Sequence, residues 1–239
     1  MTVSVLASLC FTSCVFALQT SVQYKEAQSR RSQLSATTVS EVEFFSTHVG
    51  GLKLVPRTGW LNHGISPLKC ESVADHSYRL AILVMLYDPD ANLGKKLNIS
   101  KMSQMALLHD LAESIVGDIT PPADSGVSRA EKHDLEHKAM VTILATLSDK
   151  KKAEFRSLFE EYEAQVTEEA KFVKDCDRIE MCSQALEYEN RENVDLTGFF
   201  TATRNKARFP QTIAWDEELF RSHELLKKGK KTEKKRNRA

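Results

Sequence analysis

The sequence has 239 residues, 41% of them hydrophobic and 28% charged, which is enough apolar material for one globular core and a small appendage. Lysine and arginine together number 33, as do aspartate and glutamate, so no net charge directs the whole protein to nucleic acid or to a membrane surface. The five cysteines include no C-x-x-C pair. This pattern excludes a zinc ribbon, disfavours a disulfide scaffold and favours free thiols in a reducing compartment.

The first 38 residues differ in composition from the rest of the chain. Residues 3–18 are apolar and uncharged but short for a membrane span, and the following segment is rich in Ser and Thr and poor in acids. Such a combination is typical of targeting, although the basic start of a secretory signal is missing. We therefore treat residues 1–38 as a leader that is disordered or removed, which leaves no membrane segment in the mature form. The localisation stays open between an organelle or secretory address and the cytoplasm, and a spurious upstream start is the alternative.

Helical spacing of apolar residues predicts one all-α domain, a helical bundle, over residues 39–228. Ser72 is a candidate N-cap, Ser128 and Glu131 form a candidate capping box, and Gly117 is a typical helix end. Alternating β-branched runs bounded by turn residues do not compete with this interpretation. The expected loops lie at residues 56–71 and 117–127, and the expected helices at residues 42–52, 71–87, 99–117, 127–147, 149–165, 167–191 and 216–229.

The end of the chain, residues 229–239, is a basic low-complexity run. It has no apolar side chains to bury, so we expect a disordered, solubilising tail. A nuclear signal or a weak nucleic-acid contact is the alternative. We expect no specific nucleic-acid partner.

A cluster of polar residues interrupts the apolar pattern of residues 99–117. His109, Asp110 and Glu113 lie within one helical turn of each other and are expected to share one edge of the helix. Together with a second histidine, these side chains would form a mixed nitrogen and oxygen set suited to a divalent ion. A bound metal would offset the free-energy cost of burying these polar groups. The other candidates are His76 on the preceding expected helix, and Asp175 and Asp177 on the helix at residues 167–191.

Each of these residues also has an ordinary structural interpretation. A single histidine on an apolar face, such as His76 taken alone, is more often a hydrogen-bonded core residue than a ligand. A second His-Asp pair, His133 and Asp134 followed by His137, lies among Lys, Glu and Asp residues. We expect that second pair to face solvent.

Five stretches in order distinguish the first pair from the second. They are LKLVPRTGW at 52–60, ESVADHSYRLAILVM at 71–85, ALLHDLAESIVGDITPP at 106–122, EKHDLEHKAM at 131–140 and FVKDCDRIEMCSQALEYE at 172–189. Together they resemble the HD-domain metal-dependent phosphohydrolases, and more closely their 5′-deoxynucleotidase branch, over roughly residues 41–225. The resemblance implies an all-α HD-domain bundle with a buried divalent metal site.

The resemblance also implies a set of metal and catalytic residues. His76, His109, Asp110 and Asp177 would hold the catalytic ion, with Asp175 as the competitor for the last position. Glu113 would be the acid/base residue, and Asp118 would act with it. In some relatives Glu113, Asp118 and the Ile119 carbonyl help to hold a second ion.

Substrate contacts are implied for Arg57, which matches a phosphate-binding arginine, and for Trp60, which matches a tryptophan beside the sugar. The two are adjacent in bacterial relatives but separated here by "TG", and the alternatives are a helix-capping arginine and a core tryptophan. The implied reaction is metal-dependent hydrolysis of deoxyribonucleoside 5′-monophosphates by a homodimer, with Mn²⁺, Co²⁺ or Mg²⁺ expected and Zn²⁺ or Fe²⁺ as further options. The alternatives are hydrolysis of another phosphoester, such as a cyclic nucleotide or an alarmone, and a catalytically silent helical binding module.

Overall fold

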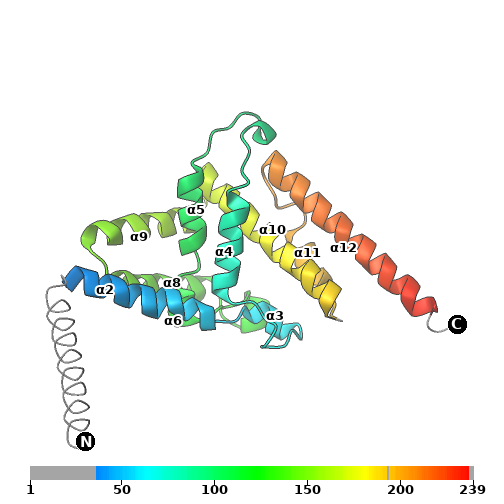
Figure 1. The fold of residues 1–239 in the computed structure, drawn as a ribbon, viewed down its shortest axis with the longest axis horizontal. Coiled ribbons are helices and arrows are strands. Elements are labelled where there is room, and N and C mark those ends of the chain that lie inside the picture. Colours follow the sequence, from blue (N-terminus) through cyan, green and yellow to red (C-terminus); the bar gives the residue numbers. More distant parts are fainter. Residues whose placement is uncertain (1–35, 193, 237–239) are drawn as a thin grey trace, which may run out of the picture.

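The computed structural model describes residues 36–192 and 194–236, and this part of the chain is helical, with one isolated β-bridge and no longer strand (Figure 1). The leader expected at residues 1–38 lies outside the described residues, apart from residues 36–38. The elements in chain order are α2 (Ala36–Phe44), η1 (Phe45–Val49), η2 (Leu52–Leu54), α3 (Thr58–Asn62), α4 (Val73–Val84), η3 (Asp90–Asn92), α5 (Ile99–Leu108), α6 (Glu113–Val116), α7 (Pro122–Ser125), α8 (Arg129–Leu144), α9 (Asp149–Ala164), α10 (Glu168–Arg191), α11 (Thr197–Thr203) and α12 (Pro210–Arg236).

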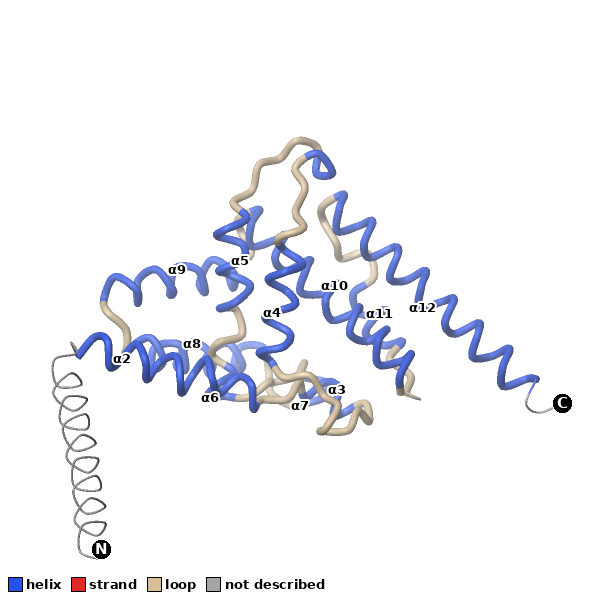
Figure 2. The backbone as a smooth tube through the Cα atoms, viewed as in Figure 1, coloured by secondary structure: helices blue, strands red, loops and turns tan. Residues whose placement is uncertain are grey.

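The centre of the bundle is formed by α4, α5 and α10. Helix α4 packs against both α5 and α10, while α12 runs along the outer side of α10 (Figure 1). Figure 2 shows that the loops flanking α3 and α7 gather near the N-terminal end of α4. None of the helices in the described ranges has the length and apolar character needed to cross a membrane.

Three buried clusters hold the bundle together. The first joins α4, α5 and α10 through residues such as Leu80, Met102 and Phe172. The second lies between α6 and α8 around Leu111 and Ile143. The third joins the α3 segment to α10 and α11 and includes Trp60, Tyr188 and Phe200. Close packing in these clusters holds the helices in fixed positions relative to one another.

The start of α4 is fixed by local hydrogen bonds that the sequence predicts. The Ser72 hydroxyl accepts a hydrogen bond from the Asp75 amide, and the Asp75 carboxylate accepts one from the Ser72 amide, which completes a capping box. An antiparallel bridge joins Pro56 to Ser72. It ties the segment before α3 directly to the first turn of α4.

The helix expected at residues 99–117 is wrong as a continuous element. Helix α5 ends at Leu108, and α6 begins at Glu113. Between them the Leu111 amide donates to the Leu108 carbonyl and the Glu113 amide to the Asp110 carbonyl, a three-residue spacing tighter than that of an α-helix. This tight turn redirects the chain between Asp110 and Glu113.

Other boundaries also differ from the expectation. The loops at 56–71 and 117–127 contain the short helices α3 and α7. The tail expected from residue 229 is wrong up to Arg236, because α12 continues to that residue. Lysine and arginine are good helix formers, and the Lys230 ammonium donates to the Glu189 carbonyl on α10. At the other end the helical prediction for 42–52 is confirmed, but the π-helical turn η1 shifts the buried face, so Phe44 is buried while Val42 and Phe45 are exposed.

The cysteines agree with the sequence analysis as far as the structure describes them. Cys70, Cys176 and Cys182 are free, and the last two are buried. Burial raises the pKa of Cys182 to about 11 and that of Cys176 well above its ordinary value. The two buried side chains are therefore uncharged packing residues.

Candidate metal and substrate site

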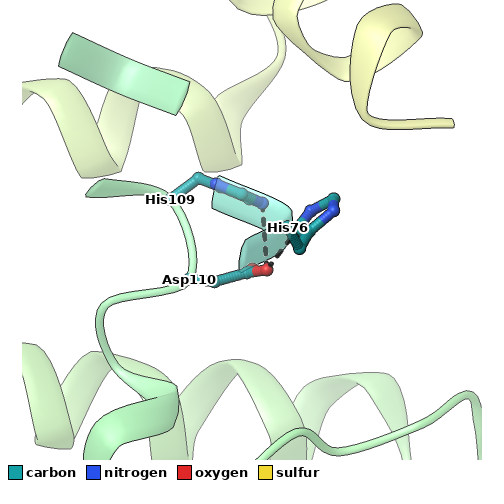
Figure 3. Close-up of side chains that lie close together, drawn as sticks. All are labelled: His76, His109 and Asp110. Carbon is teal, nitrogen blue, oxygen red and sulfur yellow. Dashed lines mark ion pairs between the residues drawn. The ribbon is translucent and has the colours of Figure 1, made fainter. Parts of the chain in front are cut away.

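Two helices bring His76, His109 and Asp110 together (Figure 3). His76 lies in the first turn of α4, and His109 and Asp110 follow the last residue of α5. The Asp110 Oδ2 atom lies 3.0 Å from His109 Nε2 and 3.8 Å from His76 Nε2. One potential ligand atom from each residue falls within 4.8 Å of the others, a spacing compatible with a single bound ion.

Helix α10 contributes Asp177 to the same place. Its Oδ1 atom lies 3.3 Å from His76 Nε2. Asp175 faces the other way, because residues two apart on a helix point in nearly opposite directions. The Asp175 carboxylate accepts hydrogen bonds from the Arg208 backbone at 2.6 Å and from the Thr212 hydroxyl at 3.1 Å. The geometry therefore favours Asp177 over Asp175 as the fourth ligand.

The two imidazoles are oriented as metal ligands require. His76 Nδ1 lies 2.6 Å from Glu180 Oε2, and His109 Nδ1 lies 2.8 Å from the Ala106 carbonyl. Both partners are acceptors, so in the neutral, metal-binding form of each ring Nδ1 carries the hydrogen and Nε2 presents a lone pair. Both Nε2 atoms are buried and have no hydrogen-bond partner among the described residues. This pair of buried, unpaired acceptors fits a divalent ion.

Neighbouring positive charges hold the carboxylates of Asp110 and Asp177 in their ionised form. Burial opposes ionisation, but His109 and Arg57 outweigh it and lower the pKa of Asp110. Lys174 and His76 likewise lower the pKa of Asp177 well below its usual range despite burial. For His76, burial and Arg57 act downward, but Asp177 and Glu180 raise the pKa to about 9. A metal that binds here must therefore displace a proton from His76.

Glu113 lies beside this cluster at the start of α6. Its side chain is 1% exposed, and its Oε2 atom has no hydrogen-bond partner within the described part of the chain. Burial, reinforced by the negative charges of Asp110 and Asp118, raises the pKa of Glu113 well above its ordinary value. A buried carboxyl group with a raised pKa is suited to accept and donate a proton during a reaction.

Arg57 reaches the cluster from the loop before α3. Its Nη1 atom lies 3.3 Å from Asp110 Oδ2 and 3.5 Å from Asp118 Oδ1. Burial acts against its charge, but Asp118 and Asp110 raise the pKa of Arg57 further above its usual value, so the guanidinium stays charged. Asp118 also accepts a hydrogen bond from the Thr58 amide at 2.5 Å, which holds the loop against the site.

Trp60 is buried and fixed on the neighbouring side. Its indole Nε1 donates to Glu71 Oε1 at 2.7 Å, and its ring packs 4.5 Å from that of Phe199, measured between centroids. Phe199 in turn contacts His63, with ring centroids 4.9 Å apart. Trp60 is thus a core residue, and Trp60, His63 and Phe199 together form an aromatic wall of the pocket.

A pocket of about 530 Å³ joins these groups. Arg57, Asp110, Glu113 and Asp177 line it together with the aromatic wall. Asp118 and Ile119, the residues implied for a second ion, line it as well. Of the predicted site residues, only the imidazoles of His76 and His109 are set behind the lining, 0% and 5% exposed.

The second His-Asp pair behaves as expected. His133, Asp134 and His137 are exposed on α8. Two residues near the site were not singled out by the sequence analysis as functional. Glu180, which orients His76, is three residues after Asp177 on α10, and Lys132 lines the pocket from α8. The sequence offered one indication for Glu180: it follows Asp177 by three residues, so both side chains lie on the same face of a helix.

The buried Glu71 gives the site a measurable pH dependence of stability. Burial and the nearby Glu180 raise its pKa to about 7, from an ordinary value of 4.5. Between these values the folded state keeps a proton that the unfolded state releases, so the free energy of unfolding falls as pH rises through this interval. Glu71→Gln keeps an acceptor for Trp60 and has no charge. We expect it to be the more stable protein above this interval, by about 1–3 kcal/mol.

Thermal unfolding of wild type and Glu71→Gln from about pH 4 to pH 8 checks this expectation. The difference in Tm should grow with pH in favour of the variant, whereas the exposed Glu154→Gln on α9 should show no such trend. A constant difference across the range would contradict the raised pKa.

Comparisons with known proteins confirm the resemblance. A family model described as HD domain matches residues 49–213. The 5′-deoxynucleotidase HDDC2 of Xenopus laevis is 45% identical over 171 residues, covering 71% of this chain and 81% of that protein. The 5′-deoxynucleotidase hdd1 of Schizosaccharomyces pombe is 43% identical over 197 residues, covering 80% and 93%. A solved structure, a conserved hypothetical protein from Pyrococcus furiosus, matches with a TM-score of 0.61 at 32% identity, covering 75% of this chain and 99% of its own. The chain therefore belongs to the HD-domain family, in the branch that contains proteins named 5′-deoxynucleotidases.

Proposed function

We propose that this chain hydrolyses deoxyribonucleoside 5′-monophosphates to deoxynucleosides and phosphate with the help of a divalent ion. The observation that carries the proposal is the convergence of two imidazoles with buried Nε2 atoms, two ionised carboxylates, a charged arginine and a buried carboxyl group at one pocket. The names of the relatives support the class of substrate.

The charged residues that line the pocket are the groups that phosphoester hydrolysis needs. An ion held by His76, His109, Asp110 and Asp177 would lower the pKa of a water molecule and polarise a phosphoryl oxygen. The Arg57 guanidinium offers a fork of donors to the phosphate, whose oxygens take the place of its present carboxylate partners. Glu113 accepts the proton of the attacking water at Oε2 and returns a proton to the leaving 5′-oxygen.

The aromatic wall gives the pocket its selectivity for the sugar of the nucleotide. The hydrogen bond to Glu71 and the packing against Phe199 hold the Trp60 ring in place. A rigid indole beside the sugar leaves no room for a ribose 2′-hydroxyl, which favours deoxyribose. Phe199 offers a flat apolar surface on which any base can pack, because every base has a π-face.

The resemblance implies Mn²⁺, Co²⁺ or Mg²⁺, with Zn²⁺ and Fe²⁺ as alternatives. A set of two nitrogen and two oxygen donors accepts any of these ions. A homodimeric assembly and the lack of a specific nucleic-acid partner remain predictions from the resemblance.

Phosphate release from dAMP and AMP by metal-stripped full-length protein, with Mn²⁺, Co²⁺, Mg²⁺ or Zn²⁺ added back, tests the proposal. We expect metal-dependent release from dAMP and a rate on AMP lower by at least about tenfold, since a steric clash of more than about 1.4 kcal/mol is sufficient.

Equal rates on the two nucleotides would refute sugar selection by Trp60. Metal binding without release from either would direct attention to cyclic nucleotides or alarmones. Absence of metal binding would favour a silent binding module.

A further inference from the structure

Lys132 on α8 enters the pocket opposite Arg57. Its ammonium donates a hydrogen bond to the Ile119 carbonyl at 2.9 Å and lies 3.8 Å from Glu113 Oε1. The side chain is one-third exposed, and Glu136, one turn further along α8, holds it at 3.3 Å. The ammonium is therefore held in place over two oxygen atoms of the site.

These two oxygens belong to the group implied for a second divalent ion. The third member of that group, Asp118, is already engaged by Arg57 and by the Thr58 amide. All three potential ligands thus have cationic or N–H partners supplied by the chain itself. The carboxylates of Glu136 and Glu113 lie against the Lys132 ammonium and hold its positive charge at these ligands.

We propose that Lys132 is a built-in cation that takes the place of a second divalent ion, so that each chain binds one ion tightly. The ammonium and a divalent ion at Glu113 and the Ile119 carbonyl would share the same oxygens and repel each other. The inference rests on the metal assignment of the proposed function.

Mn²⁺ titration of the full chain, followed by calorimetry and by metal analysis after desalting, tests the inference. Wild type should retain one Mn²⁺ per chain. Lys132→Met should leave the first affinity unchanged and bind a second Mn²⁺ at least about tenfold more tightly than wild type does, because a unit charge beside the ligands is removed. Lys138→Met, at an exposed position on the same helix, is the matched control and should behave as wild type.

Two equally tight ions in wild type, or an unchanged second affinity in Lys132→Met, would overturn the inference. Failure of every protein to bind Mn²⁺ would instead overturn the metal assignment of the proposed function. If Lys132→Met does not fold, as judged by circular dichroism, Lys132→Gln takes its place, since it is neutral yet keeps a donor for the Ile119 carbonyl. Lys132→Arg, which keeps the charge, should bind a single tight ion.

Discussion

Asp110→Ala should remove the tightly bound ion and lower kcat/KM by about a thousandfold or more, which corresponds to roughly 4 kcal/mol of lost transition-state stabilisation. Asp110 Oδ2 lies between the two Nε2 atoms, so its removal leaves the imidazoles without the carboxylate that completes the cluster (Figure 3). It also removes a partner of Arg57. Calorimetric Mn²⁺ titration and phosphate release from dAMP measure the two losses.

The chain has a matched control for this variant. Asp134 also follows a histidine, but it is exposed on α8, away from the pocket lining. Asp134→Ala should therefore bind Mn²⁺ and turn over dAMP as wild type does. If Asp110→Ala kept both properties, the assignment of the metal site would be wrong.

Glu113→Gln should retain the first ion and lower kcat by about 10²- to 10⁴-fold, with little change in KM. The glutamine is close in size and keeps the packing of a side chain that is 1% exposed, but it cannot accept the proton of water. In wild type the carboxyl must lose its proton to act as a base, and its pKa is raised. The rate should therefore fall as pH drops through that pKa, and this limb should be absent in the variant.

Steady-state kinetics across pH, together with Mn²⁺ titration, separate a proton-transfer role from metal binding. Glu160→Gln, an exposed change on α9, controls for general effects of removing a negative charge. Loss of Mn²⁺ binding in Glu113→Gln would show that Glu113 acts as a ligand of the first ion rather than as its acid/base partner.

The local signals in the sequence were sufficient for most of the helices. The N-cap at Ser72 and the capping box at Ser128 form as predicted, because they depend on residues within one turn. The break between Leu108 and Glu113 was not predictable in this way, since the segment contains neither glycine nor proline. Packing of Leu111 into the second core cluster accompanies the turn, and such contacts between distant segments override local helix propensity.

The candidate site shows the same difference between features that local sequence signals determine and features that depend on contacts between distant segments. Residue pattern alone left Asp175 and Asp177 as competitors, and the resemblance favoured Asp177. The orientation of α10 separates them physically, with Asp175 facing Arg208 and Asp177 facing His76. Glu180 and Lys132 were harder still to identify as parts of the site. Each is a charged residue on a long helix, and its role in the site depends on which side chain of another element it contacts.

The bridge between Pro56 and Ser72 fixes both ends of the segment that contains Trp60 and His63. One end holds Arg57, and the other begins the helix of His76, so the phosphate side and the ion side share one rigid attachment. Residues 61–69 lie between these anchors. Substitutions or insertions there would reshape the surface that meets the nucleoside while leaving the hydrolytic groups in register, which gives natural selection a place to alter substrate range without rebuilding the chemistry.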